Sequence, residues 1–168
     1  MKMQSIILLL NDVRSCYNVG SIFRTADAVG VSKIVCCGIT PYPRTKNDSR
    51  PEKVIINNTK MIHKTALDSE NSVKYEHMNE ISTAIKKYKR LGYQVIALEN
   101  KLENTKNIFE FKADKNNIVL IVGSETDGIN KTILTLCDST IEIPMHGIKN
   151  SLNVSVATGI ALYSITES

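Results

Sequence analysis

Polar side chains gather in the segment 143–163, where a short apolar strand gives way to a helix. The strand ends at Ile143 and Pro144, and apolar residues at helical spacing predict the helix that follows. Four polar residues lie at the joint, namely Asn150, Ser151, Asn153 and Ser155. One of them would suffice to cap the helix, because a side-chain oxygen accepts a hydrogen bond from the first turn. The excess predicts a binding site for a polar ligand at this helix N-terminus.

Two other joints between strand and helix carry polar residues. Asn18 and Arg24 follow the apolar strand 5–10, and Glu125 lies between Gly123 and Gly128 after a second apolar strand. Each joint also has a purely structural interpretation, since glycines suit a tight turn and an arginine on a helix surface suits an ion pair, here with Asp27. Ligands of open α/β sheets bind at the carboxyl ends of the strands, so we predict that the three joints converge there.

Apolar strands alternate with helices along the whole chain. We predict strands at 5–10, 33–37, near 73, 94–98, 118–122 and 140–143, and helices at 18–29, 59–66, 78–91 and 129–136, with a closing helix that includes 156–164. Asn18 is the expected N-cap of the first helix, and the segment 38–58 is expected to be a long surface loop. This order is typical of an α/β fold with a mostly parallel sheet covered by helices on both faces. We predict one domain over residues 1–168.

Composition excludes several classes of protein. With 42% hydrophobic and 23% charged residues, the chain of 168 residues is typical of a soluble globular domain. The apolar run 6–10 is too short for a signal peptide or a membrane span, so we expect a cytoplasmic protein without a membrane partner. The four cysteines and three histidines show no metal-ligand spacing, so we expect reduced thiols and no metal.

The net charge of +4 is concentrated in one segment. Residues 41–64 hold six basic and two acidic residues, the basic ones being Arg44, Lys46, Arg50, Lys53, Lys60 and Lys64. Because it also contains Tyr42, this segment is a candidate for phosphate contacts and a stacked base. The alternative is a basic loop without a partner. A second basic run, 86–90, lies on a predicted amphipathic helix and is expected to be a solvated face.

The three joints together resemble the motifs of a known family. Asn18-x5-Arg24, Gly123-x-Glu125-x2-Gly128 and Ile143-Pro144-Met145 followed by Ser151-Leu152-Asn153 are similar to the three motifs of the TrmH family, SPOUT-class RNA ribose 2′-O-methyltransferases. The resemblance covers nearly the whole chain. It implies a C-terminal deep trefoil knot, a homodimer, S-adenosylmethionine as the methyl donor and tRNA or rRNA as the substrate.

The resemblance also implies roles for individual residues. The positions that match the family's donor-binding residues are Leu98, Gly123, Ile143, Met145, Ser151 and Leu152. The positions that match its polar catalytic set are Asn18, Arg24, Glu125, Ser151 and Asn153. Because a guanidinium barely deprotonates in proteins, we expect Arg24 to hold the target phosphate and stabilise the developing alkoxide rather than to act as a base. The RNA contacts are expected at Arg44, Lys46 and Arg50.

Two alternatives of other kinds stay open at this stage. One is a non-catalytic RNA-binding protein on the same dimeric fold, and the other is an enzyme of the same fold that methylates a base nitrogen. The complete polar set argues against the first, and the pair Asn18 and Arg24 argues for ribose over a base. A dinucleotide-binding protein has less support, because the chain lacks a GxGxxG fingerprint.

Overall fold

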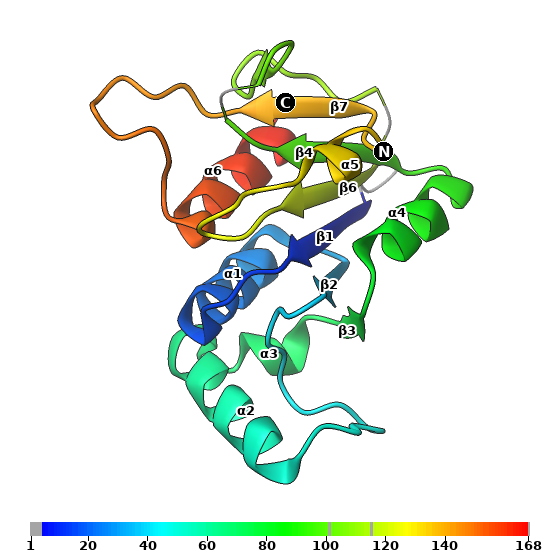
Figure 1. Ribbon diagram of the computed structural model, residues 1–168, viewed down its shortest axis with the longest axis vertical. Helices are drawn as coiled ribbons and strands as arrows, with labels where there is room; N and C mark the ends of the chain where they lie inside the picture. Colours follow the sequence, from blue (N-terminus) through cyan, green and yellow to red (C-terminus); the bar gives the residue numbers. More distant parts are fainter. Residues whose placement is uncertain (1–4, 101, 115, 168) are drawn as a thin grey trace.

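The computed structural model describes residues 5–100, 102–114 and 116–167, and it is built around one parallel sheet (Figure 1). Seven strands pair in the order β3-β2-β1-β6-β4-β7-β5. Their bounds are β1 Ser5–Asn11, β2 Lys33–Cys37, β3 Tyr75–Met78, β4 Gln94–Leu98, β5 Lys106–Asn107, β6 Asn117–Val122 and β7 Ser139–Glu142. All pairings are parallel, as the unbroken apolar runs predict.

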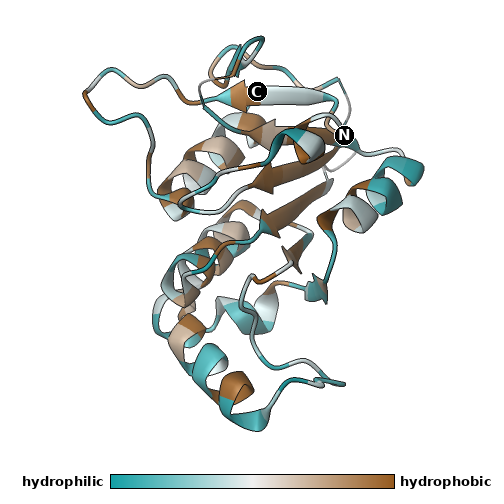
Figure 2. Cartoon of the chain, viewed as in Figure 1, coloured by the Kyte–Doolittle hydropathy of each residue, from teal (hydrophilic) through white to brown (hydrophobic). Residues whose placement is uncertain are grey.

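Helices cover both faces of the sheet. Their bounds are α1 Cys16–Val29, α2 Glu52–Ala66, α3 Ser69–Ser72, α4 Ile81–Arg90, α5 Lys131–Leu134 and α6 Val154–Thr166. Alternate residues of each strand point to opposite faces, so Leu8 packs with α1 and α6 while Leu9 packs with α4. The neighbours Cys36 and Cys37 accordingly enter different cores. The central strands β1, β4 and β6 are strongly hydrophobic, as their brown colour in Figure 2 shows.

The predicted N-cap of the first helix was wrong. Helix α1 begins at Cys16, and its cap lies three residues earlier than expected, at Ser15, whose side chain accepts a hydrogen bond from the Asn18 backbone N–H. Gly30 ends the helix in the left-handed region with φ 79°. The side chain of Asn18 is thereby released from capping and available for contacts elsewhere.

The predicted loop 38–58 is shorter than expected, because α2 starts at Glu52 rather than near residue 59. The segment 52–58 contains β-branched and asparagine residues, which are weak helix formers. Tertiary packing compensates for the weak helix preference, because Ile55, Ile62 and Ala66 are buried. Helix α1 also lies close to α2 at Gly20, where an added Cβ atom would lie only 2.3 Å from the Ile62 carbonyl oxygen. The other differences are small. Helix α5 is a single turn, β3 begins at Tyr75, and β5 and α3 were not predicted.

The closing helix α6 follows a long loop from β7 and returns to pack against α1 (Figure 1). Its buried residues are Thr158, Ala161, Leu162 and Ile165. Val156 of the same helix is 51% exposed. Within the described part of the chain, no helix has both the length and the apolar character needed to cross a membrane.

Candidate functional site

Three loops meet at the carboxyl ends of β1, β6 and β7. Strands β1 and β6 are neighbours, and β4 separates β6 from β7. The first loop leads into α1, the second is the turn 123–130, and the third is the segment 143–153 before α6. The convergence expected from the sequence is therefore present in the fold.

The side chain of Asn18 joins all three loops. Its Nδ2 donates to Glu125 Oε1 at 2.8 Å, and its Oδ1 accepts from Asn153 Nδ2 at 3.1 Å. Asn153 in turn caps α6, because its Oδ1 accepts from the Ser155 backbone N–H at 2.9 Å. Glu125 lies 107 positions after Asn18 along the chain, and Asn153 lies 135 positions after it. The three side chains thus form one hydrogen-bonded row, Glu125–Asn18–Asn153.

Glu125 is held as a carboxylate. Burial by itself raises its pKa, but hydrogen bonds from the Arg14 backbone N–H, the Asn18 amide and the Ser15 backbone N–H outweigh this and lower the pKa below its usual value. The two backbone bonds measure 3.0 and 3.2 Å. Glu125 is therefore ionised at neutral pH and acts as an acceptor that orders the start of α1.

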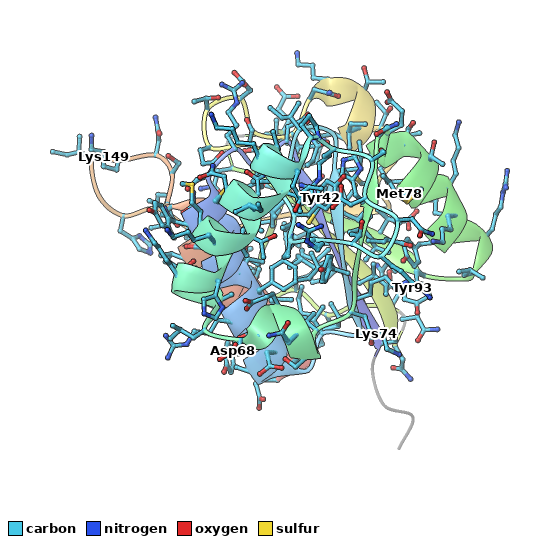
Figure 3. The ribbon with its side chains drawn as sticks, turned by 90° about the horizontal axis from the view of Figure 1, so that it is seen from below. Tyr42, Asp68, Lys74, Met78, Tyr93 and Lys149 are labelled. Carbon is cyan, nitrogen blue, oxygen red and sulfur yellow. The ribbon has the colours of Figure 1, made fainter. Side chains whose placement is uncertain are left out.

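A cavity of about 370 Å³ lies beside this row of residues. Apolar side chains form part of its wall, and polar groups of the turns 123–128 and 150–153 and of the segment after β4 form the rest. The predicted donor-binding and catalytic residues among its lining are Leu98, Gly123, Glu125, Ile143, Ser151, Leu152 and Asn153. Met145 lines a second cavity, of about 300 Å³, which shares Asn100, Ile143 and Asn150 with the first. Figure 3 shows Lys149 on the loop 143–153, which extends away from the body of the molecule.

Two glycines give the turn 123–128 its shape. A Cβ at Gly123 would lie 2.4 Å from the carbonyl carbon of Gly128, so any larger residue would open the turn. Gly128 has φ +64°, and a Cβ there would lie 2.3 Å from Glu99 Oε2. The glycines thus allow the backbone to form one wall of the cavity.

Arg24 is not part of this cluster. It lies exposed on α1, and within the described residues it forms no ion pair, while its expected partner Asp27 accepts from Ser72 Oγ at 2.6 Å. Helix α1 packs against α6, and Thr25 lies beside Gly159 of that helix. Arg24 is thus on the exposed surface of α1 rather than in its own chain's cavity.

The basic loop 38–51 is ordered by an internal clamp. Arg50 binds both Asp48 carboxylate oxygens, at 2.8 and 2.6 Å, donates to the Tyr42 and Pro43 carbonyl oxygens, and lies 3.4 Å from the centroid of the Tyr42 ring. Tyr42 also stacks on His77 at 4.4 Å and lies among other side chains in Figure 3. Arg44 pairs with Glu52 on the surface, and Lys46 is exposed. Of the three predicted RNA contacts, Arg44 and Lys46 face solvent and Arg50 is engaged internally.

Sequence reasoning missed several residues that shape the site. Glu99 accepts from the Ile129 backbone N–H at 2.7 Å, and Asn100 exchanges two hydrogen bonds of 3.3 Å with the Ile143 backbone. Both residues line the cavity. They directly follow the buried strand β4, so the rule that polar residues at strand ends mark a site would have found them.

A separate cluster lies where α2 meets α3. His63 Nδ1 is 2.6 Å from the carboxylate of Glu70, and Asp68 lies 3.8 Å away. The hydrogen bond to Glu70 raises the pKa of His63. The short contact is a direct hydrogen bond between the two side chains, and it ties α2 to α3.

The cavity suits an adenosyl group with a positively charged sulfur. Leu98, Ile143 and Leu152 offer apolar contacts for a purine, and Ser151 and Asn153 offer hydrogen bonds. The ionised carboxylate of Glu125 makes the cavity favourable for a cation. A cavity at the carboxyl edge of a parallel sheet is where open α/β proteins bind their ligands.

Comparison with known proteins identifies the family. The SpoU rRNA Methylase family model matches residues 5–163, and the chain belongs to this family. A relative from Vibrio vulnificus (strain CMCP6), named 23S rRNA (guanosine-2′-O-)-methyltransferase RlmB, is 28% identical over 158 residues, which are 94% of this chain and 57% of the relative. The chain likewise spans 58% of a TrmH family relative from Staphylococcus aureus.

Solved structures share the fold. The TrmH/SpoU tRNA modifying enzyme of A. aeolicus is 29% identical, with a TM-score of 0.72 over 98% of this chain and 75% of that one. The SpoU methyltransferase AviRb from Streptomyces viridochromogenes, in complex with the cofactor AdoMet, has a TM-score of 0.76 at 23% identity, over 99% of this chain and 58% of that one. The α/β fold with a parallel sheet is therefore the one expected from the sequence.

Proposed function

We propose that this chain is an S-adenosylmethionine-dependent RNA methyltransferase that modifies a ribose 2′-hydroxyl of tRNA or rRNA. The observation that carries the proposal is the row Glu125–Asn18–Asn153 beside a cavity that fits the donor. Family membership supports it, since the named relatives include RNA 2′-O-methyltransferases.

The chemistry sets the requirements for the site. S-adenosylmethionine, when bound, supplies an electrophilic methyl group to which a ribose oxygen bonds as the sulfur–carbon bond breaks. A hydroxyl is a poor nucleophile at neutral pH, and holding it in line accounts for roughly 7–11 kcal/mol of barrier reduction. The row of residues fixes the start of α1 and the cap of α6, so the two walls that receive the ribose stay in place. The hydroxyl proton leaves to water, and a fixed cation stabilises the oxygen that develops negative charge.

The cation is Arg24 of a second subunit in this proposal. The family resemblance implies a homodimer, and α6 carries an exposed apolar face that supports one: Val156 and Tyr163, two turns apart, are each 51% exposed. Arg24 is exposed on α1, the helix that packs against α6, so we infer that pairing through α6 brings it toward the partner's cavity. Asn18 would then orient the substrate within its own chain.

The remaining family features join the proposal. We infer the trefoil knot from the family resemblance, and α6, the segment that would form it, packs against α1. Arg44 and Lys46 are the proposed phosphate contacts, and Arg50 shapes the loop that presents them.

The free thiols of Cys16, Cys36, Cys37 and Cys137 fit a reducing cytoplasm.

The deciding experiment maps 2′-O-methylation across cellular RNA with and without the gene. We expect the loss of methylation at one or a few ribose positions, and its restoration by the purified protein with S-adenosylmethionine. Calorimetry with the donor provides an independent readout, since a non-catalytic RNA-binding protein of the same fold would bind RNA without the donor. A methyl group on a base nitrogen instead of a ribose would replace this proposal by the base-methylation alternative.

A further inference from the structure

Three lysines form one stripe along helix α2. Lys53 and Lys60 are seven residues apart, and Lys64 lies four further on, a spacing that places all three on one face of a helix. Each is exposed, and Asn57, which lies between them on the same face, is exposed as well. The stripe is about 16 Å long at 1.5 Å per residue, enough to follow several phosphates of a nucleic-acid strand.

The charge of this stripe is not neutralised within the protein. Among residues 5–100, 102–114 and 116–167, none of the three lysines has a carboxylate within ion-pair distance, and the one acidic residue of α2, Glu52, pairs with Arg44. Helix α4 is the natural comparison, because it is also basic. There Lys87 lies 2.9 Å from Glu76 and Lys89 lies 2.7 Å from Asp138. Two of the three α4 lysines are thus matched by acidic neighbours, whereas the α2 lysines leave a positive potential at the surface.

The stripe ends at an aromatic residue next to the site. Lys64 Nζ lies 6.0 Å from the centroid of the Tyr17 ring, and Tyr17 is 44% exposed. Thr65 Oγ1 donates to the Tyr17 carbonyl oxygen at 2.9 Å, which fixes this end of α2 on the first turn of α1. The next residue along α1 is Asn18, the centre of the hydrogen-bonded row.

We propose that Lys53, Lys60 and Lys64 form a track for the RNA backbone, and that Tyr17 stacks on a base where the track reaches the site. The inference rests on the proposed RNA methyltransferase function and extends it to a surface of α2. A row of unpaired cations that leads to an exposed aromatic ring suits a polyanion with stacked bases. The track also continues from the basic loop, since the Arg44 backbone N–H donates to Thr59 Oγ1 of α2 at 3.0 Å.

The test is the salt dependence of RNA binding. The triple variant Lys53→Gln, Lys60→Gln, Lys64→Gln is compared with wild type by fluorescence anisotropy, with a labelled mixed-sequence RNA stem-loop as the probe. We expect the slope of log K against log salt to become shallower by roughly 2, because each lost phosphate contact removes about 0.7 to 0.9. The corresponding fall in affinity is about tenfold or more at moderate salt.

The matched control removes the same charge from α4, through Lys86→Gln, Lys87→Gln, Lys89→Gln. We expect the slope of this variant to stay close to wild type, and both variants to bind S-adenosylmethionine as wild type does, which shows that fold and donor cavity are intact. Equal changes in the two variants, or no change in the α2 variant, would overturn the track. A wild-type protein that binds RNA through α2 yet transfers no methyl group would instead refute the proposed function and leave the track standing.

Tyr17 has a test of its own. Tyr17→Phe keeps an aromatic face and should bind the stem-loop like wild type, whereas Tyr17→Ala should lose roughly five- to a hundredfold in affinity, the range that stacking of one base supports. Equal binding by the two variants would remove Tyr17 from the track.

Discussion

At the scale of single residues, the site depends on an amide that both donates and accepts. Asn18 donates toward Glu125 and accepts from Asn153, and its side-chain amide offers both functions in one planar group. Because Glu125 is ionised, any residue at position 18 that carries a negative charge or lacks the N–H would leave the carboxylate without one of its donors. The identity of this residue is therefore more constrained than its exposure suggests.

We expect Asn18→Asp to impair both the site and the local fold. The new carboxylate would face Glu125 at hydrogen-bond distance, so repulsion should raise the pKa of Glu125 and separate α1 from the turn 123–128. The loss in the free energy of unfolding should be about 1 kcal/mol, because the row is exposed to solvent. Methyl transfer to RNA should fall much more than this stability loss explains.

The measurement combines urea denaturation with a methyl-transfer assay at neutral pH. Asn130→Asp is a suitable control, because Asn130 caps α5 through its side-chain oxygen and an aspartate can do the same. Wild-type turnover in Asn18→Asp would contradict the role of the row.

At the scale of elements, the loop 38–51 is an example of a segment that its own side chains order. Asp48 accepts from the Thr45 backbone N–H and from Arg50, whose guanidinium in turn covers the Tyr42 ring. The side chains of Arg50 and Asp48 are only 16% and 3% exposed. The hydrogen bonds from Arg50 hold the pKa of Asp48 well below its usual range. The loop is therefore a fixed platform for Arg44 and Lys46.

The depressed pKa of Asp48 predicts a stability term that depends on pH. A carboxyl group whose pKa is lower in the folded state stabilises the protein fully above its unfolded value of about 4, and this contribution is lost as the pH falls below that value. Asp48→Asn should therefore lower the free energy of unfolding by about 2 kcal/mol at pH 7. The difference from wild type should shrink steadily in acid.

Urea titrations between neutral and acidic pH provide the measurement. Glu52→Gln serves as the control, since its pair with Arg44 lies on the surface and should matter little at any pH. A difference between Asp48→Asn and wild type that stays constant with pH would mean that Asp48 is not the group that titrates.

At the scale of the whole molecule, the position of Arg24 makes the oligomeric state part of the mechanism. Arg24 lies outside the cavity of its own chain, whereas Glu125 lines that cavity. If a dimer through α6 supplies Arg24 to the partner's site, each site consists of residues from two chains.

Mixing two inactive variants tests this arrangement. Arg24→Ala and Glu125→Ala should each be inactive alone, but a heterodimer of the two has one site with both defects and one intact site. Refolding an equal mixture should restore about a quarter of the wild-type activity, because half of the dimers are mixed and each has one intact site. The mass of the particle in light scattering should be that of two chains. A mixture that remains inactive would place Arg24 in its own chain's site or outside the mechanism.

The amino-acid sequence alone determined the types of residues at the three joints, the apolar strands and the class of fold. These features are local, since alternation and helical spacing follow from the geometry of each element. The sequence also predicted that Asn18, Glu125 and Asn153 belong together, although it assigned Asn18 to the wrong task of capping α1.

Only the tertiary structure decided which partner each polar group takes. Asn18 meets Glu125 and Asn153 across more than a hundred residues, and Arg50 turns inward to Asp48 while Lys53, Lys60 and Lys64 keep their charge exposed. The physical reason is that hydrogen bonds and ion pairs form between whichever groups the packed elements bring within about 3 Å, and no spacing along the chain encodes that distance. The length of α2 followed the same rule, because its packing on α1 outweighed the weak helix preference of its first turns.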